Sequence, residues 1–79
     1  MLNDFLVMVG KNIVYNMGEK RNWQGRLAKD ERAKCLTIRT PTNSHPMLGS
    51  YEQESPWSQA NTVVLKEGVA YIVPSREAA

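Results

Sequence analysis

The chain has 79 residues, which allow one domain with a thin core, and its formal net charge is +2. Cys35 is the only cysteine, so an internal disulfide is excluded, and with the single histidine it cannot supply a four-ligand zinc site. Oligomerisation is the remaining common support for so small a fold. The mild positive charge permits contact with nucleic acid without requiring it.

No apolar run approaches the roughly 20 residues of a membrane span, and residues 1–9 lack the basic start of a signal peptide. We therefore expect a cytoplasmic protein with no membrane partner. No nucleophile–base pair, metal-ligand set or glycine-rich phosphate loop stands out in the sequence. We expect no enzymatic activity and no cofactor.

The first half of the chain predicts a helix and two strands. In chain order these are a helix over 2–9, a strand over 13–17, a turn at 18–20 and a strand over 21–29. Gly10 is placed to end the helix. Gly25, in the middle of the second strand, predicts a sharp bend, a bulge or the close approach of another backbone. A bent second strand is what a small barrel needs in order to close.

The second half predicts three more strands around a long loop. In chain order we expect a charged turn at 30–34, a strand over 35–40, a loop over 41–56, strands over 58–65 and 69–73, and a frayed polar tail over 75–79. Leu36 and Ile38 are expected to face the core. Trp23 is also expected in the core because it alternates with polar neighbours, whereas His45 is expected to be a solvated loop residue.

The last two strands form a short hairpin around a predicted three-residue turn, Lys66–Gly68. Both strands are almost wholly apolar, and strands that are apolar on both faces are covered on both faces. A domain this small can hardly cover both faces of its final hairpin. The hairpin therefore predicts contact with a second chain.

Two motifs in this order follow the short helix. The first is an apolar strand and a turn, then an aromatic residue, a glycine and a leucine on the bent strand, then an acidic residue and a final apolar strand. Its residues are Ile13, Tyr15, Met17, Trp23, Gly25, Leu27, Glu31, Leu36 and Ile38. The second is a basic-glycine turn between apolar runs: Val63–Leu65, Lys66–Gly68 and Val69–Ile72. Over residues 2–74 the chain resembles the Sm-like family, which includes the Sm and LSm proteins and bacterial Hfq. The 41–56 loop falls at the variable loop of that family.

The resemblance implies a fold and an assembly. The fold is all-β, a short helix followed by a strongly bent five-stranded antiparallel barrel of the SH3-like kind, as one domain over 1–79 with its barrel over about 12–74. The assembly is a homo-oligomeric ring of five to seven subunits, in which the fourth strand of one subunit pairs with the fifth strand of the next. The implied interface residues are Val63, Val64, Leu65, Val69, Tyr71, Ile72 and Val73.

The resemblance also implies single-stranded RNA as the partner, bound at the inner rim of the ring. The positions that match the family's RNA-binding motifs are Glu31, Arg32, Ala33, Lys34, Cys35, Lys66 and Gly68. Ala33 cannot stack on a base, Cys35 lacks the amide that reads one, and Lys66 lacks a planar group. The base-recognition pocket is therefore predicted to be degenerate.

Three alternatives stay open at this point. A turn shorter by one residue would give the RNA-contacting roles to Asp30, Arg32 and Lys34. The ring could instead be a structural or protein-interaction assembly that no longer binds RNA, with the 41–56 loop and Trp57 as its contact. A monomeric SH3-like barrel is the alternative for the fold.

Overall fold

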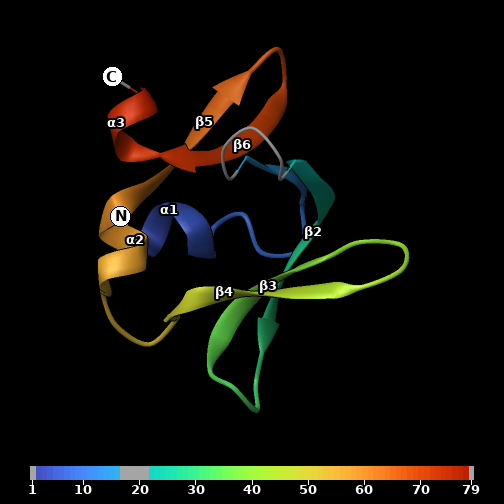
Figure 1. Cartoon of the computed structure of the whole chain (residues 1–79), viewed down its shortest axis with the longest axis vertical. Coiled ribbons are helices and arrows are strands. Elements are labelled where there is room, and N and C mark those ends of the chain that lie inside the picture. Colours follow the sequence, from blue (N-terminus) through green and yellow to red (C-terminus); the bar gives the residue numbers. More distant parts are fainter. Residues whose placement is uncertain (1, 17–21, 79) are drawn as a thin grey trace.

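The computed structural model describes residues 2–16 and 22–78, so the predicted turn at 18–20 lies outside the described residues. The protein is mainly β, with a short N-terminal helix (Figure 1). The elements in chain order are α1 (Leu2–Leu6), β1 (Asn12–Asn16), β2 (Asn22–Asp30), β3 (Cys35–Arg39), β4 (Ser44–Ser50), α2 (Pro56–Ala60), β5 (Asn61–Lys66), β6 (Val69–Pro74) and α3 (Ser75–Ala78).

The strands form a single six-stranded sheet in the order β4-β3-β2-β1-β6-β5. Four neighbouring pairs are antiparallel, whereas β1 and β6 run parallel. The expected five-stranded antiparallel barrel is therefore wrong in strand number and in one pairing. Among the described residues β4 and β5 do not pair with each other, so the sheet is open and these two strands are its edges.

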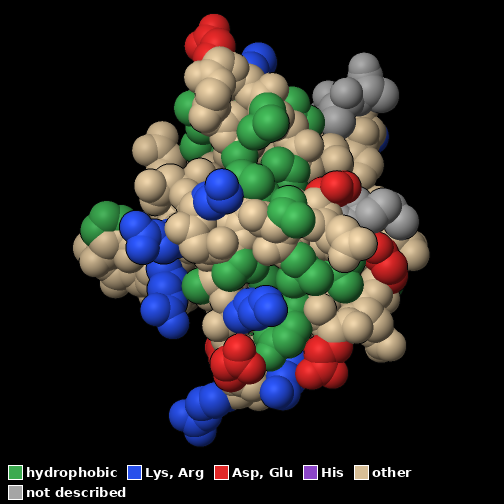
Figure 2. Space-filling model, turned by 180° about the vertical axis from the view of Figure 1, so that it is seen from behind, with side chains coloured by type: hydrophobic (Ala, Val, Ile, Leu, Met, Phe, Trp, Pro, Cys, Tyr) green, Lys and Arg blue, Asp and Glu red, His purple; other side chains and the backbone are tan. Residues whose placement is uncertain are grey.

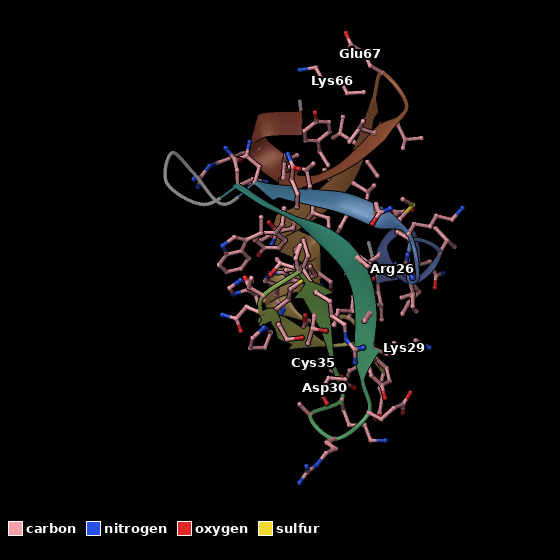
Figure 3. All side chains as sticks on the ribbon, turned by 90° about the vertical axis from the view of Figure 1, so that its right-hand side faces the viewer. Arg26, Lys29, Asp30, Cys35, Lys66 and Glu67 are labelled. Atoms are coloured by element: carbon pink, nitrogen blue, oxygen red, sulfur yellow. The ribbon has the colours of Figure 1, made fainter. Side chains whose placement is uncertain are left out.

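The close approach predicted at Gly25 is confirmed. A Cβ atom at this position would overlap the carbonyl oxygen of Arg39, and it would stand 3.1 Å from Cγ1 of Ile38. Such contacts arise because β2 curves strongly along its length (Figure 3), which brings the end of β3 over its inner side. Only glycine fits there, since it has no side chain to collide with the neighbouring backbone.

The core lies between the inner face of the sheet and α1. Its buried apolar side chains are Phe5, Ile13, Tyr15, Leu27, Leu36, Ile38, Met47, Ala70 and Ile72. The prediction that Leu36 and Ile38 face the core is confirmed. Trp23, which was expected in the core, is half-buried and packs against the core from its margin.

Contacts between aromatic rings join the core to α2 and β4. Trp57 lies 4.9 Å from Phe5 and 6.2 Å from Tyr15 between ring centroids, and its Nε1–H donates to the Tyr15 hydroxyl at 3.0 Å. Trp23 stacks on His45 with 3.8 Å between centroids. His45 is therefore half-buried on a strand, and the expectation of a solvated loop residue is wrong.

The segment predicted as a loop over 41–56 contains β4, which pairs with β3. Pro46 made the segment look irregular, yet a proline is tolerated on an edge strand, where its missing N–H costs no ladder bond. The fourth predicted strand begins three residues late, at Asn61, because α2 occupies the residues before it. Ser55 caps α2 by accepting from the Ser58 amide. The predicted frayed tail contains α3, and the Ser75 hydroxyl donates to the Gln59 carbonyl at 3.1 Å.

The final hairpin closes through two residues, one fewer than predicted. Lys66 and Val69 are paired, and Glu67 and Gly68 between them have φ values of +53° and +79°. Positive φ at both central residues is the requirement of a type I′ turn, whose twist matches that of the strands.

Candidate nucleic-acid interface

The turn between β2 and β3 carries most of the RNA-binding residues predicted from the sequence, and it is ordered by its own hydrogen bonds. Oδ1 of Asp30 accepts from the amides of Arg32 at 3.0 Å and Ala33 at 3.1 Å. The hydroxyl of Tyr51 donates to Oε2 of Glu31 at 3.0 Å. The side chains of Glu31 to Lys34 are exposed, so the turn presents both signs of charge to solvent.

Cys35 follows this turn and is half-buried at the start of β3. Burial, and then the nearby Asp30 carboxylate, raise the pKa of its thiol above the ordinary value of 9.0. The thiol is therefore protonated at neutral pH and is a weak nucleophile. It supplies neither the amide chemistry of a base-reading pocket nor a reactive group.

The structure does not bring the two predicted halves of the RNA pocket together within one chain. Lys66 and Glu67 lie at one end of the molecule, and Asp30 and Cys35 lie near the other (Figure 3). The molecule's longest dimension is 32 Å and runs vertically in this view. The described residues of a single chain therefore do not form one pocket from both turns.

The predicted interface residues are also distributed differently than expected. β6 pairs with β5 on one side and with β1 on the other, so its backbone is used within the chain. Ile72 is buried in the core, and Val69, Tyr71 and Val73 face the other side of the sheet. On β5, Val63 packs against the core and Val64 is half-buried, whereas Leu65 is 73% exposed. Of the two hairpin strands, only β5 therefore has a free edge.

A groove runs over the outer face of the sheet, on the side away from the core. It has a volume of about 640 Å³. Its lining residues that bear on chemistry are Asn12, Val14, Gln24, Arg26, Arg39 and Tyr71. Figure 2 shows hydrophobic side chains gathered in a band on the face seen from behind, with separate Lys and Arg side chains among them.

Two arginines dominate the charge of this groove. Arg26 on β2 and Arg39 on β3 are direct cross-strand partners, and both are exposed. No carboxylate among residues 2–16 and 22–78 forms an ion pair with either guanidinium. Like charges directly opposite each other weaken a sheet. An anion bound between the two guanidinium groups would relieve that repulsion.

Apolar and aromatic side chains from β1 and β6 line the rest of the groove. Tyr71 on β6 is the cross-strand partner of Val14 on β1, and both line the groove, together with the 39%-exposed Val69. The amides of Asn12 and Gln24 stand on the same outer face. The groove thus combines cations, one ring and two side chains that both donate and accept hydrogen bonds.

A second groove of about 410 Å³ continues the first across the sheet. Arg39 lines both grooves, and the second is also lined by Lys29, Glu31 and Arg32. At the opposite end, Lys66 is the cross-strand partner of Val69. The two grooves therefore form a path over the outer face from Val69 to Arg32, and Lys66 lies beyond its Val69 end. Along the long axis, Arg26 lies between Lys66 and Asp30 (Figure 3).

Arg32 and Lys66 were predicted from the sequence as RNA-contacting residues, whereas Arg39 was not, and Tyr71 was predicted only as an interface residue. Gln24 and Arg26 were visible as the polar face of the second strand. Arg39 is placed opposite Arg26 by the register of β2 and β3, and Tyr71 is placed beside Val14 by the parallel pairing. Neither pairing follows from local pattern.

Comparisons with protein-family models, curated proteins and solved structures find no match. None of the described helices is long and apolar enough to cross a membrane. Within the part of the chain that the structure describes, no group of three or more His, Cys, Asp or Glu side chains could hold a metal ion.

Proposed function

We propose that this protein binds single-stranded RNA along the outer face of its sheet. The observation that carries the proposal is the pair Arg26 and Arg39, which are directly opposite each other and line one groove together with Tyr71. Electrostatic contact with phosphates and stacking of bases on aromatic rings is the usual way in which proteins hold single strands.

Each component of the groove has a chemical task in this proposal. The guanidinium groups of Arg26 and Arg39 bind phosphate oxygens, since their planar forks match that geometry. The ring of Tyr71 stacks on a base, and the valines beside it cover the base edge that faces the sheet. Asn12 and Gln24 can donate to and accept from a base or a ribose hydroxyl.

The same residues argue against strict sequence selectivity. Two phosphate-binding arginines and one stacking ring accept any nucleotide, because every base has a π-face and every nucleotide has a phosphate. The path that continues to Arg32 at one end and Lys66 at the other extends the contact along the backbone. We therefore expect binding that depends on strand length and on salt more than on sequence.

The test is fluorescence anisotropy with labelled oligo-U and oligo-A between about 50 and 200 mM salt. Arg26→Ala and Arg39→Ala should each lower the slope of log K against log salt by about 0.7, which is the contribution of one phosphate contact on a single strand. Arg76→Ala on α3 removes the same charge away from the groove and is the matched control.

A second variant separates stacking from charge. Tyr71→Leu keeps apolar bulk and removes the ring, so it should weaken binding by the ~1–3 kcal/mol of one stacked base while leaving the salt slope unchanged. No binding at the lowest salt concentration, or an equal loss in Arg26→Ala and Arg76→Ala, would refute the proposal.

A further inference from the structure

The two edges of the sheet differ in how well they are protected. The edge strand β4 contains Pro46, which has no N–H to donate, and its ladder with β3 shifts register between Cys35 and Thr37. Proline and bulges are the devices by which natural edges avoid pairing with other chains. The edge strand β5 has neither of them, and it pairs with β6 along its whole length without a shift. It carries no charge before Lys66.

The backbone of β5 offers hydrogen-bonding groups on its free side. The turn hydrogen bond of the hairpin joins Lys66 to Val69, and bonded pairs alternate with non-bonded pairs along an antiparallel ladder. Val64 therefore directs its N–H and C=O toward β6. Val63 and Leu65 direct theirs away from it, at an edge that no other strand of the described chain covers.

We propose that β5 pairs with β5 of a second copy of this chain, antiparallel about a two-fold axis, with the two Val64 residues opposite each other. In this register Val63 of one copy lies beside Leu65 of the other, so the outward N–H and C=O groups of both residues find partners. Leu65, which is 73% exposed in the single chain, is then covered by an apolar neighbour.

Strand direction favours this dimer over a ring. β4 and β5 both run opposite to β1, so a head-to-tail junction that continues the sheet would join them in parallel. Parallel pairing is slightly weaker per residue than antiparallel pairing, and it would have to use the strand that contains Pro46. The two-fold arrangement uses the unprotected edge twice and leaves the protected edge in solvent.

The dimer would also bring two grooves to one face. A two-fold axis perpendicular to the sheet keeps both outer faces on the same side, and Val64 shares that face with Tyr71. From β1 of one copy to β1 of the other there are five strand spacings, or about 24 Å. This consequence rests on the proposed RNA binding, whereas the pairing itself does not.

The test is the mass in solution, by light scattering and native mass spectrometry, of the full chain and two variants. Leu65→Lys places a charge in the proposed junction at a side chain that is mostly exposed, so the monomer should still fold. Ser44→Lys places the same charge on the exposed start of β4 and is the matched control. Circular dichroism reports folding of each variant.

The expected result is twice 8.9 kDa for the unaltered chain and for Ser44→Lys, and 8.9 kDa for a folded Leu65→Lys. Oligonucleotides long enough to span both grooves should then bind the unaltered chain at least about tenfold more tightly than Leu65→Lys, and short ones equally. A monomeric unaltered chain, a mass of five to seven subunits, or a dimeric Leu65→Lys would overturn the proposal. Loss of the length effect alone would count against the RNA groove and not against the dimer.

Discussion

Replacing Gly25 by alanine tests the feature on which both the bend of β2 and the position of Arg39 depend. The new Cβ would overlap the Arg39 carbonyl oxygen. It would also stand 2.8 Å from the carbonyl carbon, whereas ordinary van der Waals contact begins at 3.4 Å, so this backbone must retreat by at least about 0.6 Å. Because the obstacle is backbone and not the end of a flexible side chain, no rotamer change relieves it.

Two opposing effects determine how much Gly25→Ala lowers the free energy of unfolding. Overpacking of this kind costs typically about 1–3 kcal/mol, and a rigid backbone obstacle places Gly25→Ala near about 3 kcal/mol. Alanine also restricts the unfolded chain, which stabilises the fold by about 0.4–1 kcal/mol. The net loss is about 2 kcal/mol, out of the roughly 4–12 kcal/mol typical of a domain this size.

Urea denaturation followed by tryptophan fluorescence measures this loss. With a slope of about 1 kcal/mol per molar urea, the midpoint of Gly25→Ala should fall by about 2 M. Gly10→Ala is the control: Gly10 has a φ of +89°, but no atom lies within 4 Å of where a Cβ would stand, so this variant carries backbone strain without a collision. If the midpoint falls no further in Gly25→Ala than in Gly10→Ala, the close approach of β3 is wrong.

Three further predictions concern single side chains. The amide at the start of α1, and then the Ser58 hydroxyl, hold the pKa of Glu54 below its ordinary 4.5, so Glu54→Gln should lower the urea midpoint at pH 7, with the difference vanishing as the pH falls through that lowered pKa. Trp57→Phe should lower the free energy of unfolding, measured by urea denaturation, by about 1 kcal/mol because it removes the hydrogen bond to the Tyr15 hydroxyl. If Trp57→Phe lowers it equally in a Tyr15→Phe background, where that hydrogen bond is already absent, this explanation is wrong. Cys35 should react with a disulfide reagent more slowly at pH 8 than a free thiol, as its raised pKa requires.

The parts of the fold that were predictable are those in which local pattern and tertiary packing agree. Leu36 and Ile38 have the spacing of one strand face and are buried. Gly25 lies in a strand because another backbone comes too close for any side chain there, as is common for strand glycines. The helix was also predictable, but its end was not. Gly10 has the positive φ of a helix stop, yet regular helix ends at Leu6 and turns fill the interval.

The predictions that were wrong concern segments whose composition is typical of a loop. The segment with Pro46 and Gly49 lacks the β-branched residues that signal a strand, and it is held by pairing with β3 and by the stack of His45 on Trp23. The short helix α2 has a local signal in Ser55 followed by Pro56, an N-cap residue and a proline at the first helical position. Five residues are too few for a helical period to show, so the apolar run after them dominates the pattern.

The candidate site shows the same division between local and long-range information. Arg32 and Lys66 were predictable because turns expose charged residues. Arg26 lies opposite Arg39 because of the register between β2 and β3, which are separated by a turn. Tyr71 is positioned by the parallel pairing of β1 and β6, which are distant in the sequence. Register and parallel pairing are set by the whole sheet, so residue pattern alone leaves them open.

The apolar final hairpin predicts a second chain, and the structure narrows that prediction to one strand. β6 needs no partner, because its inner side packs in the core and its backbone is paired on both sides. Its outer side, with Tyr71, lines a groove that a ligand can cover. Of the two edges of the described sheet, β4 is protected by Pro46 and β5 has no such protection. The exposed apolar outer face therefore supports the proposed RNA groove, whereas the unpaired backbone of β5 supports the proposed dimer. Tyr71→Leu and Leu65→Lys test these two proposals separately.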